Sequence, residues 1–258
     1  MSEAFREYET RLEPARRRFA ARGTLETVLA PGTDAALLEL FLIHFCSLGV
    51  GMTEPVEGWI RRAGERCEGM GLTDLGRSLR QHAAHEGGHH MMMIEDTRKL
   101  VARWNARRRP LLDAEALLGQ PLSPGVVGYR KLHEDVIGGP APFGQLAIEF
   151  EIENLSVVHG APFLQRCAGR LGSDVLGGLS FLEEHVALDV GHTKFNAREM
   201  DRLLRYYEQQ KELMLRDPET AEKLYPANGI EGVDRTEAAA WVSVSTVLLN
   251  LDEFITRN

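Results

Sequence analysis

Residues 181–195 read FLEEHVALDVGHTKF and place His185, Asp189 and His192 in a His-x3-Asp-x2-His pattern. Because an α-helix turns by about 100° per residue, these three side chains lie on one stripe about 60° wide. Two imidazoles and a carboxylate on one stripe can form half of a metal site, and they suit iron, manganese or zinc better than magnesium or calcium. A polar helix face is the simpler interpretation of a lone triplet, so the rest of the chain must decide.

A second group of donors lies earlier in the chain, in the segment LRQHAAHEGGHHMMM of a helix predicted over residues 73–107. Glu86 and His89 are three residues apart, so both can reach one point. His82 and His90 each lie about 40° from Glu86, on opposite flanks of the helix. Spacing alone therefore does not choose between His89 and His90.

A third segment, LAIEFEIENL, carries carboxylates on a helix predicted to begin near residue 143. Glu149 and Glu153 are four residues apart and share a face, whereas Glu151 points the other way. A carboxylate at the edge of an apolar stripe is costly unless it is paired, which makes this shared face a candidate source of metal ligands. A surface position is the simpler alternative for the pair.

Together the three segments offer three imidazoles and three carboxylates. The candidate ligands are Glu86, His89, Glu153, His185, Asp189 and His192. This set is too large for one tetrahedral zinc ion and suits two iron ions that keep open positions. Two ferrous ions bring four positive charges against three negative ones, which leaves about one positive charge for an anionic substrate group or a ligand derived from O2.

The whole chain predicts helices, because alternating β-branched runs bounded by hairpin dipeptides are absent. About seven to nine helices with short connections predict one all-α domain over residues 1–258. Besides the donor segments, helices are predicted over residues 3–22, 34–50, 53–70, 126–138, 196–214 and 236–255.

Two helices should carry irregularities. Gly87 and Gly88 inside the helix over 73–107 should cost about 1–2 kcal/mol, which is tolerable where the backbone approaches a neighbour or a ligand. A long helical pattern over residues 143–171 should be kinked or interrupted at Pro162.

Composition restricts the partners and the compartment. The net charge is −8 and no basic stripe occurs, so nucleic acid is not expected as a partner. Three cysteines without CxxC spacing, together with a charged N-terminal segment, predict a cytosolic protein. The apolar run at 35–52 contains Glu39 and His44 and predicts a buried core helix, so no membrane partner is expected.

The motifs resemble those of the haem-oxygenase-like di-iron oxidases and oxygenases. The resemblance covers about residues 80–195 and rests on HEGGHH, on AIEFEIE with Phe150 at an aromatic position, and on EHVALDVGH. The resemblance selects Glu86, His89 and Glu153 as metal ligands in addition to the His-x3-Asp-x2-His residues. His90 and Glu149 are the alternatives.

This resemblance implies a haem-oxygenase-like multi-helical fold that binds two non-haem iron ions, with manganese possible instead. It also implies activation of O2 and oxidation of a small amine-, amino-acid- or fatty-acid-like substrate, by N-oxygenation or by oxidative carbon–carbon cleavage. Members of the family form homodimers, so a homodimer is expected.

Other functions are open at this stage. Haem oxygenase itself is a poor match, since its haem ligand lies on the first helix and this chain has no histidine before His44. The alternatives are a metal-free thiaminase-like or quinone-cofactor-biosynthesis-like enzyme of the same fold, and a non-catalytic helical binding protein. Tyr129, Lys194 and Asn196 are candidate pocket residues because they lie near the donor segments, although surface contacts are the simpler interpretation.

Overall fold

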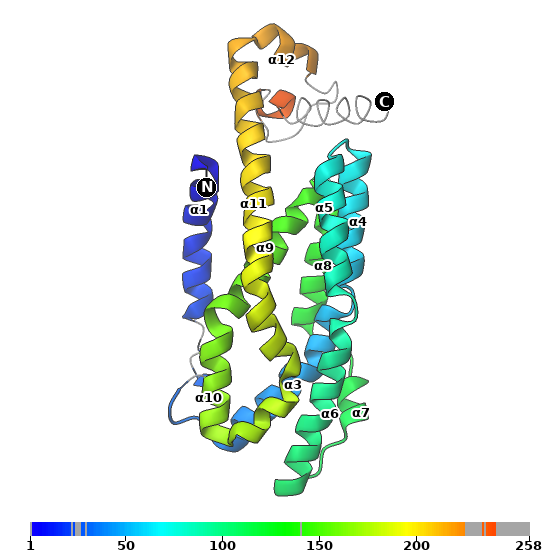
Figure 1. Ribbon diagram of the computed structural model, residues 1–258, viewed down its shortest axis with the longest axis vertical. Coiled ribbons are helices and arrows are strands. Elements are labelled where there is room, and N and C mark those ends of the chain that lie inside the picture. Colours follow the sequence, from blue (N-terminus) through cyan, green and yellow to red (C-terminus); the bar gives the residue numbers. More distant parts are fainter. Residues whose placement is uncertain are drawn as a thin grey trace.

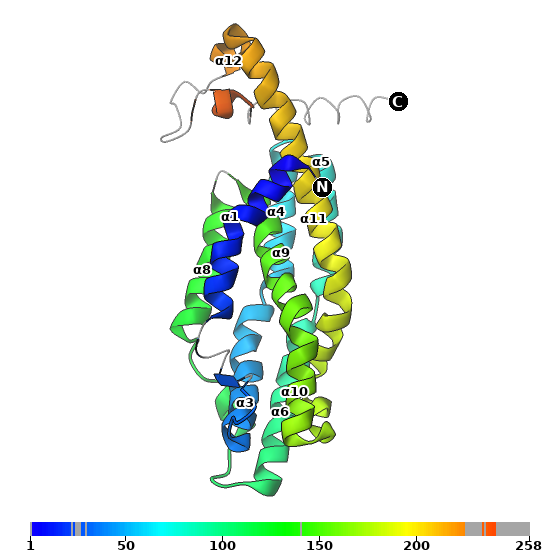
Figure 2. The same cartoon turned by 90° about the vertical axis from the view of Figure 1, so that its left-hand side faces the viewer.

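The computed structural model describes residues 2–224 except 22, 24–26, 29 and 140, together with residues 234 and 236–240. Every regular element in this part of the chain is a helix, so the predicted all-α class is confirmed. Figures 1 and 2 show an elongated bundle in which α11 is the longest helix and extends past the others to α12.

The helices follow one another with short connections. The α-helices are α1 (Glu3–Ala20), α3 (Ala35–Thr53), α4 (Val56–Gly69), α5 (Thr73–Glu86), α6 (His89–Arg107), α7 (Ala114–Leu118), α8 (Pro124–Gly138), α9 (Gln145–Leu155), α10 (Ala161–Leu171), α11 (Ser180–Arg216) and α12 (Pro218–Leu224). The shorter elements are η1 (Pro142–Gly144), η2 (Ser156–Gly160) and η3 (Ser173–Gly178).

The described residues form three buried apolar clusters, two of them large and a small one around Met214 and Ala221. The first core lies between α4, α5, α9 and part of α11 and includes Trp59, Ile60, Leu79, Phe150 and Met200. The second core lies between α3, α6 and α10 and includes Leu42, Ile43, Leu100, Trp104 and Phe163.

Six stretches of chain run from one core to the other, and three of them carry the donor segments. Of these three, the first runs from Ala83 to Leu100, the second from Phe150 to Phe163, and the third from Leu179 to Ala197. Each of the three donor segments lies on one of these crossings. The candidate ligands are therefore brought to a polar layer between two apolar cores.

The predicted helix over 73–107 is two helices, which corrects the prediction. α5 ends at Glu86 and α6 begins at His89, and the break is Gly87–Gly88. Gly88 has φ +86°, in the left-handed region that glycine enters without a Cβ clash. The two glycines thus form a joint, and they leave Glu86 and His89 facing each other across it.

The segments predicted as separate helices around 181–195 and 196–214 form one helix, α11, of 37 residues. No proline or glycine follows Gly191 within this helix, so nothing in the local sequence ends it. Buried Asp96 of α6 caps its first turn, accepting from the Ser180 hydroxyl at 2.8 Å and the Phe181 amide at 2.9 Å. This cap fixes the start of α11 against α6.

The predicted interruption near Pro162 is confirmed. A π-helical turn, η2 at Ser156–Gly160, separates α9 from α10, and proline lacks the N–H that a continuous helix would need. A Cβ on Gly160 would meet Val186 Cγ2 at 2.3 Å, so this turn lies directly against α11. Of the helix predicted over 236–255, residues 236–240 are helical and the remainder lies outside the described residues.

The stretch Ala35–Gly69 is long and apolar enough to cross a membrane by length and composition, and 44% of its most apolar window is buried inside the protein. In the structure this stretch is α3 and α4, separated by a turn at Glu54–Pro55. The buried core helix of a soluble protein passes the same test, so this finding is weak evidence for a membrane-spanning helix. The predictions of a cytosolic protein and of a single domain stay predictions.

Candidate metal centre

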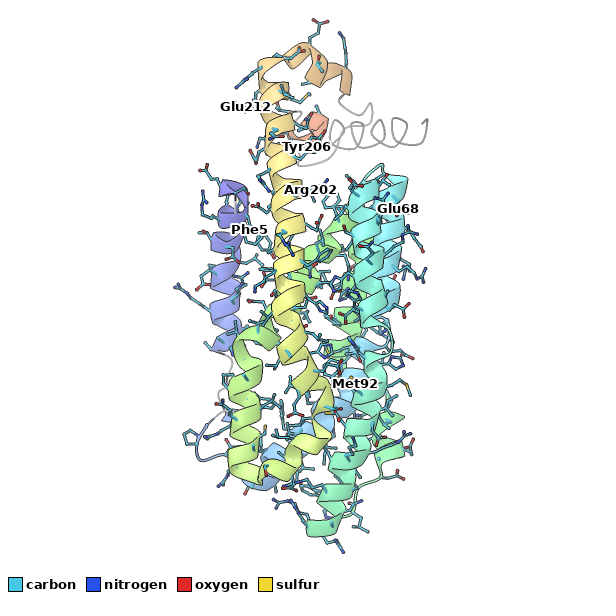
Figure 3. The ribbon with its side chains drawn as sticks, viewed as in Figure 1. Phe5, Glu68, Met92, Arg202, Tyr206 and Glu212 are labelled. Atoms are coloured by element: carbon cyan, nitrogen blue, oxygen red, sulfur yellow. The ribbon has the colours of Figure 1, made fainter. Side chains whose placement is uncertain are left out.

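Imidazoles and carboxylates from four helices meet in the polar layer. Glu86 comes from the end of α5, His89 from the start of α6, Glu153 from α9, and His185, Asp189 and His192 from α11. Met92, labelled in Figure 3, lies one turn beyond His89 on α6 and marks the level of this layer.

One group of four donors is formed by His82, Glu86, Glu153 and His192, whose candidate ligand atoms lie within 4.8 Å of one another. Nε2 of His82 lies 3.3 Å from a Glu153 oxygen and 3.5 Å from a Glu86 oxygen. Nδ1 of His192 lies 3.4 Å from the same Glu86 oxygen, Oε1. This group could hold a metal ion.

A second group shares Glu86 with the first and adds His89 and His185. The other Glu86 oxygen, Oε2, lies 3.0 Å from Nδ1 of His89. Nδ1 of His185 lies 2.8 Å from the Phe181 carbonyl oxygen, a partner to which it can donate, which leaves Nε2 as the available metal donor. Glu86 therefore faces one group with each of its two oxygens.

Asp189 lies beside both groups without belonging to either. Its carboxylate is 2% exposed, with Oδ1 3.5 Å from Nδ1 of His192. The structure thus gathers all six predicted ligands in one layer. Of the two alternatives, His90 belongs to neither group, and Glu149 lies in the wall of the adjoining cavity.

Several buried polar atoms here have no hydrogen-bond partner among the residues that the structure describes. They are both ring nitrogens of His82, Nδ1 of His192 and Oδ1 of Asp189. Buried polar groups are normally satisfied, and a concentration of unsatisfied nitrogen and oxygen donors facing one another is what a metal site requires. The donor set therefore fits transition-metal ions.

No lysine or arginine pairs with the carboxylates of this layer in the described part of the chain. The ion-pair partners of Glu86 and Glu153 are histidines, and Glu153 also accepts a 2.8 Å hydrogen bond from Nδ2 of Asn196. Asn196 is fully buried, so it holds Glu153 in one orientation from the outside of the centre.

The ionisable groups are strongly coupled. Burial would lower the pKa of His82, but Glu153 and Glu86 outweigh it and raise this pKa to about 10. Burial would raise the pKa of Glu86, but His82 and His89 outweigh it and lower this pKa. The pKa of Glu153 is raised because burial outweighs its contacts with His82 and Asn196. Metal binding at such a centre would displace protons from the imidazoles.

A cavity of about 70 Å³ adjoins the centre. Five of the predicted ligands line it, namely Glu86, His89, Glu153, His185 and Asp189. The other residues that line it come from α3, α4, α8, α9 and the first turn of α11. A molecule in this cavity would contact both the candidate ligands and these residues.

The three candidate pocket residues have different positions. Tyr129 lines the cavity, Asn196 supports Glu153, and Lys194 is exposed on α11. The donor that the ligand prediction omitted is His82, which lies one turn before Glu86 on α5. Its (i, i+4) spacing to Glu86 was the available signal.

Comparison with known proteins does not assign this chain to a family. No protein-family model, no curated protein and no solved structure matches this chain. The haem-oxygenase-like fold therefore stays a prediction from the sequence motifs.

Proposed function

We propose that this protein is a non-haem di-iron enzyme that uses O2 to oxidise a small molecule, as its resemblance to the haem-oxygenase-like oxidases implies. The observation that carries the proposal is the position of Glu86, whose two oxygens face two separate groups of nitrogen and oxygen donors. A carboxylate in this position is suited to bridge two metal ions.

The proposed ligands are Glu86, His89, Glu153, His185, Asp189 and His192, with His82 as a further donor on the His192 side. A mixture of imidazoles and carboxylates favours iron, and manganese would accept the same ligands. As ferrous ions, the bound metals would supply electrons and a place for O2 to bind.

The chain itself supplies orientation and exclusion of water. The Phe181 carbonyl fixes the ring of His185, and Asn196 fixes the carboxylate of Glu153. Asp96 holds the first turn of α11 on α6, and so sets the distance between His185 and His89. Apolar side chains of both cores flank the layer and limit the access of water to its buried side, where Glu153 and Asp189 lie.

The metal-free thiaminase-like or quinone-cofactor-type enzymes and the non-catalytic binding protein are the alternatives. Neither alternative requires unsatisfied imidazole and carboxylate atoms to converge in a buried layer. A homodimer is also part of the proposal.

Metal analysis of protein produced with ferrous iron, combined with O2 uptake, tests the proposal. We expect about two iron ions per chain and rapid O2 uptake by the ferrous protein. His192→Ala should remove at least one iron ion per chain, whereas His44→Ala changes an exposed imidazole on α3 and should leave the iron content unchanged.

Less than one iron ion per chain in the wild-type protein would reject the proposal and favour the binding protein. Full activity after chelation and without O2 would reject it in favour of a metal-free enzyme. Unchanged iron content in His192→Ala would reject the ligand assignment.

A further inference from the structure

The cavity beside the metal centre is small and largely apolar. Its volume is about 70 Å³, and its apolar wall is formed by Met52, Val56, Ile152 and Phe181. An apolar cavity of about 150 Å³ is enough for benzene, so this one encloses about three heavy atoms of a bound molecule. Most of a long fatty-acid chain would lie outside this volume.

The polar wall of the cavity presents acceptors. It is formed by Thr53, Tyr129 and Glu149. The Thr53 hydroxyl donates to the Gly49 carbonyl at 3.1 Å, so its oxygen can still accept a hydrogen bond. Glu149 is 4% exposed, and its only hydrogen bond in the described structure is a short one, of 2.5 Å, from Nε2 of Gln145. Further lone pairs of the Glu149 carboxylate are therefore open to a donor.

No lysine or arginine is among the residues that line the cavity. A substrate carboxylate normally requires a bidentate arginine or a lysine, and here it would face Glu149 instead. Glu149 also brings a fourth carboxyl group to the layer, and burial, reinforced by the charge of Glu153, raises the pKa of Glu149 to about 8. A cation bound beside Glu149 would keep this group ionised at neutral pH, whereas an anion would find no lysine or arginine among the described residues that line the cavity.

We propose that this cavity binds a small primary amine as its ammonium ion, with Glu149 as the counter-ion and the aromatic rings of Tyr129 and Phe181 beside the cation. An ammonium group has three N–H donors for the acceptors of the polar wall, and aromatic faces attract cations. A short carbon chain then contacts Met52 and Ile152. This inference rests on the proposed function, since it takes the cavity as the substrate site of the metal centre.

Calorimetric titration of the ferrous protein without O2, using three probes of similar length, tests the inference. The probes are propan-1-amine, propan-1-ol and propanoate at neutral pH. We expect propan-1-amine to bind at least about tenfold more tightly than propanoate, because the anion would lie against Glu149. Propan-1-ol should fall between them.

Two variants distinguish amine binding in the cavity from amine binding to acidic groups on the surface. Glu149→Gln should weaken propan-1-amine binding by about tenfold, because a charge-assisted contact is lost. Glu95→Gln removes the same charge from an exposed position on α6 and should leave amine binding unchanged. Tyr129→Phe, which keeps the ring, should weaken amine binding by about threefold or less.

Propanoate binding as tightly as propan-1-amine would overturn the inference, and so would unchanged amine affinity in a folded Glu149→Gln. The order of the three probes on the wild-type protein decides the question if that variant does not fold. An iron-loaded protein that takes up O2 but prefers propanoate would overturn the amine inference alone. A protein that prefers the amine but takes up no O2 would overturn the proposed function alone.

Discussion

Glu39 on α3 and Glu153 on α9 are both buried carboxylates, but their partners differ. Glu39 is fully buried and receives hydrogen bonds from Arg103 and from Arg108, the latter at 2.8 Å. Glu153 is 6% exposed, and its partners are an imidazole and an amide. Among the described residues, Glu39 has two arginines beside it, and Glu153 has no lysine or arginine.

This difference indicates what neutralises the carboxylates of the polar layer. A buried charge is costly unless it is paired, and at Glu39 the chain supplies the pairing itself. In the polar layer, Glu86, Glu149 and Asp189 join Glu153 without any lysine or arginine partner among the described ion pairs. Histidines that compete with one another for protons are poor substitutes for the arginines that pair with Glu39. A bound metal cation is therefore the expected counter-charge for the carboxylates of the polar layer.

Metal loading should have the largest effect on stability. Ferrous iron at about a thousand times its dissociation constant should stabilise the folded protein by about 4 kcal/mol. That gain corresponds to a rise of about 10 °C in the melting temperature for a chain of this size. Anaerobic calorimetry measures it, with magnesium as the control, because this hard ion prefers a shell of oxygen ligands. A melting temperature that iron leaves unchanged would contradict a metal-dependent layer.

Removing a cation from Glu39 should have the next largest effect. Arg103→Met leaves Glu39 with Arg108 as its remaining cation and should cost about 3 kcal/mol in the free energy of unfolding. Iron content should stay the same, because this network is separate from the polar layer. Urea unfolding and metal analysis of the same sample measure both quantities.

A matched control for Arg103→Met is Arg98→Met, which breaks an exposed ion pair with Glu115. Exposed pairs contribute little, so we expect the free energy of unfolding to stay close to that of the wild-type protein. Equal costs in the two variants would mean that Glu39 does not depend on Arg103.

Local signals predicted the helical class and some of its details. The helical class, the interruption near Pro162 and the His-x3-Asp-x2-His stripe all follow from spacing and from residue chemistry within one segment. The break at Gly87–Gly88 had a local signal as well, but the course of α6 after the break follows its contacts with α3 and α11. That packing is not visible in the sequence.

The composition of the metal centre was harder to predict for the same reason. A helical wheel gives the face of His82 relative to Glu86, but not which neighbouring helix meets that face. The contact from Asn196 to Glu153 joins residues 43 positions apart on α11 and α9. Glu149 could be recognised as a face-mate of Glu153 but not as a cavity wall, because other lining residues come from α3 and α8.

His133 is a third kind of buried ionisable group, neutral and without a counter-ion. It is fully buried, stacks on Trp59 with ring centroids 3.9 Å apart, and pairs through Nδ1 with the Gln145 amide. Burial lowers the pKa of His133 to about 4. In the unfolded chain the pKa is about 6.5, so the unfolded state binds more protons between these values. Stability is therefore lost as the pH falls through 6.5 toward 4.

This loss should be the smallest of the three effects, about 2 kcal/mol between pH 7.5 and pH 5. The histidines of the polar layer also titrate, so the measured quantity is the difference in unfolding free energy between the wild-type protein and His133→Gln at each pH. The lost stacking on Trp59 contributes equally at both pH values, whereas the proton contribution appears only at the lower one. A difference that does not shrink from pH 7.5 to pH 5 would mean that His133 is charged in the folded protein, and that the chain tolerates a buried cation without a carboxylate partner.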